Sequence, residues 1–129
     1  MDIQLIGNSN KLVQVFDNLI DNSLSIIGRN CKINIRAFSR GKKIFILFED
    51  NGPGFPKNAI NKIFDRFYTD RIVDRDQHSG LGLSISYEII NSFNGSIELT
   101  ESDKLDFRGA CFLIKLPLKS QNNHKRIQS

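Results

Sequence analysis

The chain has 129 residues and a formal net charge of +4, with 40% hydrophobic and 25% charged residues, which is typical of one soluble globular domain. No apolar run reaches the roughly 18 residues of a membrane span, and the N-terminus lacks the layout of a secretory signal. No basic patch is interleaved with aromatic residues, so nucleic acid is not an expected partner. We predict one domain over residues 1–118 and a polar tail over residues 119–129 that does not fold.

The first half of the chain predicts a helix and then a β-hairpin, after a short apolar start at residues 3–6. Apolar residues recur at three- and four-residue spacing over residues 11–27, which indicates an amphipathic helix capped at Asn8 or Ser9 and closed by Gly28. Two alternating runs, KINIRAFS and KKIFILFED, meet at an Arg-Gly pair and indicate an antiparallel hairpin.

The second half predicts a short helix around residues 58–64 and a long polar loop over residues 65–80. Loops of such length inside a compact domain are usually functional or disordered. GLGLSISYEIINSFNG then indicates a helix that ends at Asn94-Gly95, and the strands SIELTE and ACFLIKLP complete the fold. We expect an α/β (α+β) two-layer sandwich, with a mixed, mainly antiparallel five-stranded sheet packed against three helices.

The first of four groups of polar or glycine residues is NLIDNS on the first helix. Asn18 and Asn22 are four residues apart, so both amides lie on one helix face. An amide oxygen is a hard, neutral ligand that suits Mg²⁺ surrounded by phosphate charge. The alternative is a pair of surface amides that make ordinary hydrogen bonds.

The second group is DNGPG, which follows the second strand of the hairpin. The carboxylate of Asp50 accepts hydrogen bonds and donates none, which matches an exocyclic amine. Gly52 and Gly54 allow the backbone to approach a flat ring without a Cβ in the way. On its own, this pattern is more often a turn.

The third group, IFDRFY and its continuation, opens the long polar loop. Phe64 and Phe67 offer hydrophobic anchors, and Arg66 and Arg71 offer guanidinium groups that can bind phosphates. This composition indicates a lid over about residues 65–80. The alternative is a surface loop held by two phenylalanines.

The fourth group is SGLGLS, which opens the next helix. Gly80 and Gly82 expose backbone N–H groups at the positive end of a helix dipole, where anions bind readily. A Gly-x-Gly pattern is weak evidence alone, but it is stronger after a lid-like loop.

In this order, the four groups resemble the catalytic ATP-binding domain of sensor histidine kinases, the Bergerat-type ATPase fold that gyrase and the mismatch-repair MutL proteins also use. The resemblance covers about residues 5–117. It implies ATP and Mg²⁺ as cofactors, with Asn22 on Mg²⁺, Asn18 facing the phosphates and Asp50 accepting a hydrogen bond from the adenine amine. It further implies a nucleotide-binding role for Gly52, Gly54, Phe64, Arg66, Phe67, Arg71, Ser79, Gly80, Leu81, Gly82 and Leu83.

The resemblance also implies a reaction and its partners. The domain would transfer the γ-phosphoryl group of ATP to a histidine on a separate phosphoacceptor domain, for onward transfer to a response regulator. Hydrolysing relatives carry a glutamate at the position of Asn18, and an amide cannot act as a general base. We therefore expect a transferase, monomeric as an isolated domain, from the cytoplasmic part of a membrane-anchored kinase.

Two departures and two alternatives accompany this interpretation. Ser25 stands where the family commonly has a lysine or arginine, so Arg66 or Arg71 would have to supply a cation to the phosphates. Gln77-His78-Ser79 precedes Gly80-Leu81-Gly82-Leu83, where the family often has Gly-Thr or Gly-Ser. The alternatives are an anti-sigma-type serine kinase and a non-catalytic nucleotide-binding module of the same fold.

The two cysteines, Cys31 and Cys111, lie in strand-like apolar contexts. We expect them to be buried small hydrophobic residues in a reducing compartment. A disulfide or a metal site is the alternative.

Overall fold

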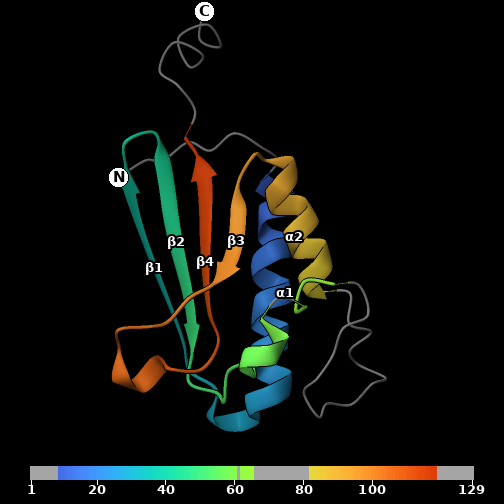
Figure 1. Cartoon of the computed structure of the whole chain (residues 1–129), viewed down its shortest axis with the longest axis vertical. Helices are drawn as coiled ribbons and strands as arrows, with labels where there is room; N and C mark the ends of the chain where they lie inside the picture. Colours follow the sequence, from blue (N-terminus) through green and yellow to red (C-terminus); the bar gives the residue numbers. More distant parts are fainter. Residues whose placement is uncertain (1–8, 61, 66–81, 119–129) are drawn as a thin grey trace, which may run out of the picture.

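Two helices pack against one face of a four-stranded sheet in the part of the chain that the computed structural model describes, residues 9–60, 62–65 and 82–118 (Figure 1). Helix α1 spans Ser9–Ile27 and helix α2 spans Gly82–Ser92. The two helices lie side by side, and α1 directs Val15, Leu19 and Ser23 inward at four-residue steps. Neither has the length and the apolar content that a membrane crossing needs.

The sheet contains β1 (Ile33–Arg40), β2 (Lys43–Asp50), β3 (Ser96–Leu99) and β4 (Cys111–Pro117) in the order β1-β2-β4-β3. Every pairing among these strands is antiparallel. The predicted hairpin is confirmed, with Arg40 opposite Lys43. The central position of β2 and β4 explains why both contribute alternating buried residues.

The core lies between the helices and the sheet. Its largest fully buried apolar side chains come from α1, α2, the segment after β2, and the two central strands: Phe48, Phe112, Leu19, Ile63, Ile90, Ile114, Leu116 and Val15. Alternation along β2 and β4 places these residues toward the helices. The same alternation fixes which strand residues remain for the other face of the sheet.

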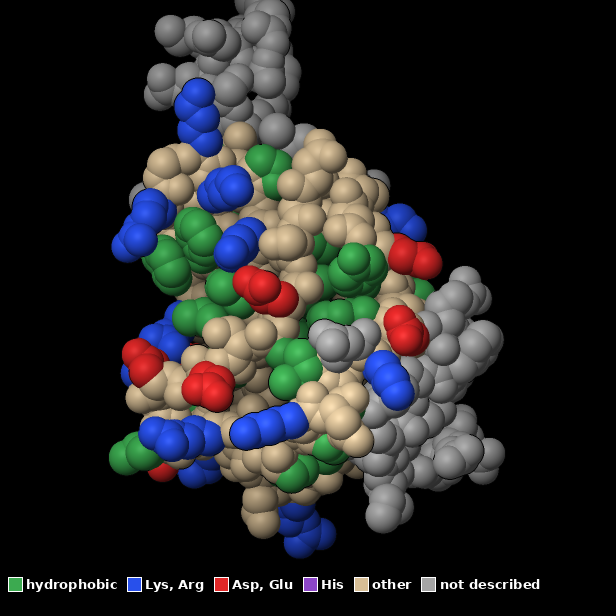
Figure 2. Space-filling view, in the orientation of Figure 1, with side chains coloured by type: hydrophobic (Ala, Val, Ile, Leu, Met, Phe, Trp, Pro, Cys, Tyr) green, Lys and Arg blue, Asp and Glu red, His purple; other side chains and the backbone are tan. Residues whose placement is uncertain are grey.

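The opposite face of the sheet combines apolar and cationic side chains. Phe38 and Phe45 are cross-strand neighbours whose stacked rings lie 5.2 Å apart, and the Lys115 ammonium lies 6.0 Å from the centre of the Phe45 ring. Figure 2 shows Lys and Arg side chains, with apolar ones between them, over the region where Figure 1 draws β1 and β2.

The prediction of a short helix around residues 58–64 is wrong. The chain instead forms a 3₁₀ turn at Lys57–Ala59, followed by further turns. Its hydrogen bonds run three residues back, from Ala59 N–H to Pro56 O at 2.9 Å and from Lys62 N–H to Ala59 O at 2.8 Å. So short a segment cannot offset the cost of starting an α-helix.

The described part of the chain therefore has two α-helices and four antiparallel strands, where the sequence predicted three helices and a mixed sheet of five strands. The apolar start at residues 3–6, which the fifth strand would need, lies outside the described residues. The two-layer arrangement and the mainly antiparallel pairing are confirmed.

Candidate functional site

Asp50 ends β2 on the helix-covered face, and its side chain is fully buried. Its Oδ1 accepts hydrogen bonds from the backbone N–H groups of Gly52 at 3.0 Å and Ala110 at 2.7 Å. Its Oδ2 accepts one from the Ser23 hydroxyl at 2.7 Å. A carboxylate offers about four acceptor positions, so roughly one position remains for a donor from outside these three. All three partners are neutral, and no described Lys or Arg forms an ion pair with Asp50.

Glycines allow the backbone to close around Asp50. A Cβ at Gly109 would overlap both the Asp50 carboxylate and the backbone of Gly52. Gly54 has φ +74°, a conformation that favours glycine, and a Cβ there would lie 3.3 Å from the Gly109 carbonyl oxygen. The close neighbours of Gly52 and Gly54 in the structure are protein atoms, the Ile27 side chain and the Gly109 backbone, so the predicted approach to a flat ring stays a prediction.

The start of β4 is joined to the end of β2 by two backbone bonds as well. The Asp50 N–H donates to Ala110 O, and the Gly109 N–H donates to Asp50 O, both at 2.9 Å. Sequence reasoning missed Gly109, Ala110 and the role of Ser23. The available signal was the glycine directly before the last strand, in Arg108-Gly109-Ala110.

Asn51 fixes the loop that leaves Asp50. Its Oδ1 accepts a hydrogen bond from Lys32 N–H at 2.8 Å, and its Nδ2 donates to Asn30 O at 2.9 Å. The loop after β2 is therefore held against the segment that follows α1. This contact and the Ser23 bond to Asp50 connect α1 and its exit to the same end of β2.

Asn18 connects α1 to the beginning of α2. Its Nδ2 donates to Gly82 O at 3.2 Å and to Ser86 Oγ at 3.3 Å. Both of these bonds use the amide nitrogen, so the amide oxygen is the atom of Asn18 that could face a cation or a water. Asn22 lies one turn further along α1 and is half-buried, whereas Asp17 is exposed. The structure thus brings Asn18 and Gly82, one residue of each of these two predicted groups, together.

Phe64 packs where the chain enters the predicted lid. Its ring lies 6.2 Å from the ring of the buried Phe112 and 5.4 Å from that of Tyr87 on α2. Phe55, from the loop after β2, also contacts Phe112, at 6.2 Å. These aromatic contacts attach both ends of the segment between β2 and the lid to the core.

The remaining predicted site residues divide into two sets. Leu83 is buried in the hydrophobic core, so its side chain helps to pack α2 against the rest of the domain. Six predicted residues lie outside the described part of the chain: Arg66, Phe67, Arg71, Ser79, Gly80 and Leu81.

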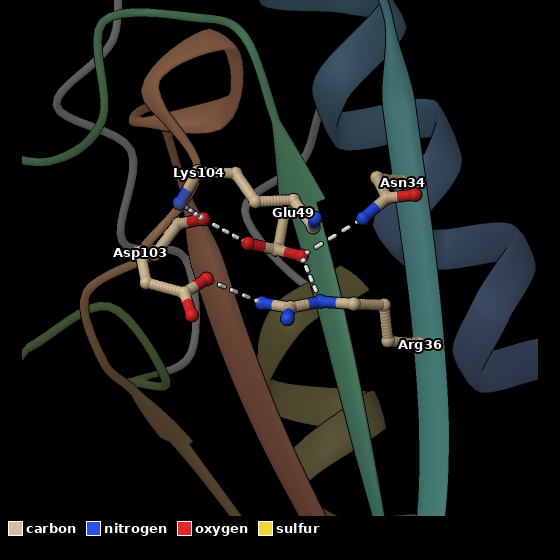
Figure 3. Close-up of polar contacts among 6 residues, drawn as sticks. Asn34, Arg36, Glu49, Asp103 and Lys104 are labelled. Atoms are coloured by element: carbon tan, nitrogen blue, oxygen red, sulfur yellow. Dashed lines mark hydrogen bonds and ion pairs between the residues drawn. The ribbon is translucent and has the colours of Figure 1, made fainter.

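A second buried carboxylate, which sequence reasoning missed, lies on the other face of the sheet. Glu49 is fully buried, and its Oε1 accepts hydrogen bonds from Arg36 Nε at 2.8 Å and Asn34 Nδ2 at 3.1 Å (Figure 3). Its Oε2 accepts one from the Ser102 hydroxyl. Arg36 also donates to the exposed Asp103, at 3.1 Å. A cross-strand comparison of KINIRAFS with KKIFILFED could have revealed the Arg36–Glu49 pair.

The pKa of Glu49 reflects two opposing causes. Burial raises it, but hydrogen bonds from Ser102, Arg36 and Asn34 outweigh burial and leave the pKa below its ordinary value of 4.5. The reason is that these donors stabilise the charged form of the acid.

Both cysteines are free thiols. Cys111 is buried as predicted, and burial together with the nearby Glu49 raises its pKa to about 11. Cys31 is only half-buried, in contrast to the prediction, and burial and Asp50 raise its pKa too. Among the described residues, no group of three or more His, Cys, Asp and Glu could hold a metal ion.

Residues 7–120 match the family model described as "Histidine kinase-, DNA gyrase B-, and HSP90-like ATPase". The sensor protein ChvG of Rhizobium meliloti is 38% identical over 116 residues, which is 86% of this chain and 20% of the relative. The signal transduction histidine-protein kinase BaeS of Escherichia coli is 34% identical over 119 residues, 91% of this chain and 25% of the relative. The chain thus spans about a fifth to a quarter of these relatives.

Solved structures show the same architecture. The catalytic domain of histidine kinase ThkA has a TM-score of 0.71 and 29% identity, covering 86% of this chain and 68% of that one. The mycobacterial sensor histidine kinase MprB has a TM-score of 0.77 at 23% identity, covering 89% of this chain and 77% of that one, and supports the fold alone. The chain belongs to the histidine kinase-, DNA gyrase B- and HSP90-like ATPase family, as an ATP-binding catalytic domain of the sensor histidine kinase type.

Proposed function

We propose that this chain binds Mg²⁺–ATP and transfers the γ-phosphoryl group to a histidine on a separate phosphoacceptor domain, which then passes it to a response regulator. The observation that carries the proposal is the buried carboxylate of Asp50, held by three neutral donors with about one acceptor position left. That position suits the exocyclic amine of adenine.

The phosphate end of ATP is assigned to the region between α1 and α2. Asn18 lies against the first residue of α2, and Asn22 follows on the same helix face. The donor set fits Mg²⁺, because this ion typically takes one or two protein oxygens and completes its shell with phosphate and water. Asn22 would hold it, and when bound it would neutralise charge on the phosphates.

The chain's own residues would act by positioning. Asp50 would fix the adenine, and Asn18 and Asn22 would orient the phosphates for attack by the acceptor histidine. Asn18 cannot remove a proton from water, which favours transfer over hydrolysis. Phe64, packed against Phe112 and Tyr87, would anchor the start of the lid at residues 65–80. Arg66 or Arg71 in that lid would supply the cation that Ser25 does not.

The partners follow from the same assignment. Histidine kinase ThkA in complex with the response regulator TrrA aligns with this chain at a TM-score of 0.68 and 27% identity, over 88% of this chain and 30% of that one. This likeness supports a response regulator as the final acceptor. We assign the catalytic domain to residues 1–118 of a cytoplasmic region, and the phosphoacceptor domain to another part of the kinase.

Isothermal titration calorimetry of Mg²⁺–ATP into the wild type and Asp50→Ala tests the adenine contact. Loss of one hydrogen bond to a charged group costs about 1.5–3 kcal/mol, so affinity should fall roughly ten- to a hundredfold. Asp106→Ala is the matched control, because Asp106 is exposed in the connection between β3 and β4. Equal affinity in the wild type and Asp50→Ala would contradict the assignment.

Transfer is tested by adding the phosphoacceptor domain of the same kinase and radiolabelled ATP. An acid-labile, base-stable phosphohistidine is expected. Phosphoserine on a partner would indicate the anti-sigma-type kinase instead, and tight ATP binding without transfer would indicate the non-catalytic module.

A further inference from the structure

The Glu49 cluster comprises Glu49, Asn34, Arg36 and Ser102. It lies on the opposite face of the sheet from Asp50, the carboxylate to which the proposed function assigns adenine. We propose that Glu49 is a positioning residue for nucleotide binding. Through Ser102 it holds the connection between β3 and β4 in the place where the Ala110 N–H reaches Asp50. The inference rests on the proposed function of Asp50 and adds residues that do not themselves touch the nucleotide.

Glu49 and Asp50 act on the same strand from opposite faces. They are consecutive residues of β2, so their side chains point to the two sides of the sheet. Glu49 lies opposite Cys111, the first residue of β4, and Asp50 binds Ala110, the residue before it. A change in the path of the chain into β4 therefore reaches both carboxylates.

The connection from Thr100 to Ala110 is held to β2 near both of its ends. Near its start, the Ser102 hydroxyl donates to Glu49 and accepts a hydrogen bond from Lys104 N–H at 3.1 Å. Near its end, Gly109 and Ala110 bind Asp50. Between these points, residues 103–106 are exposed, Leu105 at 79%, and Phe107 is half-buried, so most of the middle of the connection gains little from burial. The polar attachments at the two ends must therefore direct its path.

Arg36 strengthens the first attachment. It pairs with Glu49 through Nε and with Asp103 through Nη2, so one guanidinium joins β1, β2 and the connection (Figure 3). A buried ion pair adds little net stability over an apolar replacement of similar volume. Its contribution here is to the direction of the connection.

The tolerance for movement at Ala110 is small. Its N–H lies 2.7 Å from Asp50 Oδ1, and a shift of about 1 Å would exceed the hydrogen-bond range of about 3.2 Å. Asp50 would then keep fewer protein donors, and its carboxylate would be free to rotate away from the position that adenine needs. Nucleotide affinity should therefore depend on Ser102, although Ser102 lies on the opposite side of the sheet.

Ser102→Ala is the sharpest variant, because Glu49 keeps Arg36 and Asn34 and no buried charge loses its ion-pair partner. By calorimetry we expect Mg²⁺–ATP affinity to fall about three- to tenfold with unchanged stoichiometry, a change of up to about 1.4 kcal/mol. Ser102→Thr, which keeps the hydroxyl, should restore the affinity. Ser96→Ala, at an exposed position of β3, is the matched control and should bind as the wild type does.

Two further measurements separate positioning from general destabilisation. In ¹H–¹⁵N NMR spectra without nucleotide, the amide signals of Gly109 and Ala110 should move in Ser102→Ala and stay in place in Ser96→Ala. In the Asp50→Ala background, Ser102→Ala should cause no further loss of ATP affinity, because the route through Asp50 has already been removed.

The outcomes are distinguishable. Unmoved amide signals with wild-type ATP affinity in Ser102→Ala would overturn the inference and leave the proposed function intact. An additive loss in the Asp50→Ala background would also overturn it, because Ser102 would then act elsewhere. No saturable ATP binding by the wild-type chain would defeat the proposed function, and the inference with it.

Discussion

Two buried carboxylates occupy consecutive positions of β2 and are held in different ways. Asp50, on the helix-covered face, binds two backbone N–H groups and a hydroxyl. Glu49, on the opposite face, binds a guanidinium, an amide and a hydroxyl. Each has three protein partners, but only Glu49 has a cationic one among the described residues.

Under the proposed function, this difference separates the carboxylate that would bind a ligand, Asp50, from a structural one, Glu49. Backbone and hydroxyl dipoles orient Asp50 without cancelling a full charge, so it can still attract a donor from a ligand. The guanidinium compensates the charge of Glu49, which is the usual condition for burying a carboxylate. Burial alone would therefore not have distinguished the two roles.

The largest loss of stability and of ATP affinity should come from placing a side chain in the space next to Asp50. Gly109→Ala places a Cβ where the Asp50 carboxylate and the Gly52 backbone lie, so the strand and the loop must separate. We expect a loss of about 3 kcal/mol in the free energy of unfolding and a more than roughly hundredfold loss of ATP affinity. Urea denaturation and calorimetry measure the two effects.

Gly41→Asn is the control for this substitution. Gly41 has φ +63° in the hairpin turn, a Cβ added there would have no atom within 4 Å, and asparagine tolerates that backbone conformation. A Gly109→Ala protein as stable as Gly41→Asn would refute the crowded geometry around Asp50.

A smaller loss of stability should follow from removing Arg36, the cationic partner of Glu49. Arg36→Met leaves Glu49 buried with two neutral partners, and we expect the free energy of unfolding to fall by about 2–3 kcal/mol. Adding Glu49→Gln to this variant should recover part of the loss, because the unpaired charge is then gone. Urea denaturation at about pH 7 measures both, with the exposed Arg40→Met as the control.

The recovery is the decisive observation. If the double variant is as unstable as the sum of the two single variants, then charge compensation is not what distinguishes Glu49 from Asp50.

The smallest effect should appear in acid. The pKa of Glu49 is lower in the folded chain than its ordinary value of 4.5, because its hydrogen bonds outweigh the effect of burial. Around pH 4.5 the unfolded chain therefore binds more protons at this residue, and stability rises with pH. The contribution of Glu49 is complete above pH 4.5 and is lost as pH falls through the lower folded pKa.

Urea denaturation at a series of pH values compares the wild type with Glu49→Gln. The wild type should lose stability more steeply below pH 4.5. Parallel pH profiles for the two proteins would exclude a specific contribution of Glu49.

Local patterns predicted most of the elements. The helix expected over residues 11–27 is α1 (Ser9–Ile27), and the strand SIELTE is β3 (Ser96–Leu99), because side-chain periodicity depends on near neighbours. The short helix around residues 58–64 was wrong because periodicity over so few residues cannot distinguish an α-helix from a series of turns.

The site was less predictable, because its bonds join distant parts of the chain. Asn18 and Gly82 are 64 residues apart and Asp50 and Ala110 are 60 apart, so no local pattern shows that they meet. The order of the motifs identified Asp50 as a candidate. Ser23, Gly109 and Glu49 were missed, because their roles depend on how α1 and β4 pack against β2.

The position of β1 at the side of the sheet has a consequence for the behaviour of the protein in solution. Within the described strands β1 pairs only with β2, and the Ile35 and Phe38 side chains are about half exposed. Where the edge of a sheet is open it can recruit strands from other molecules, and natural sheets discourage this with charged side chains. Arg40 is exposed at the end of β1, so its charge would repel a second copy of the strand, whereas the charge of Arg36 is compensated by Glu49 and Asp103.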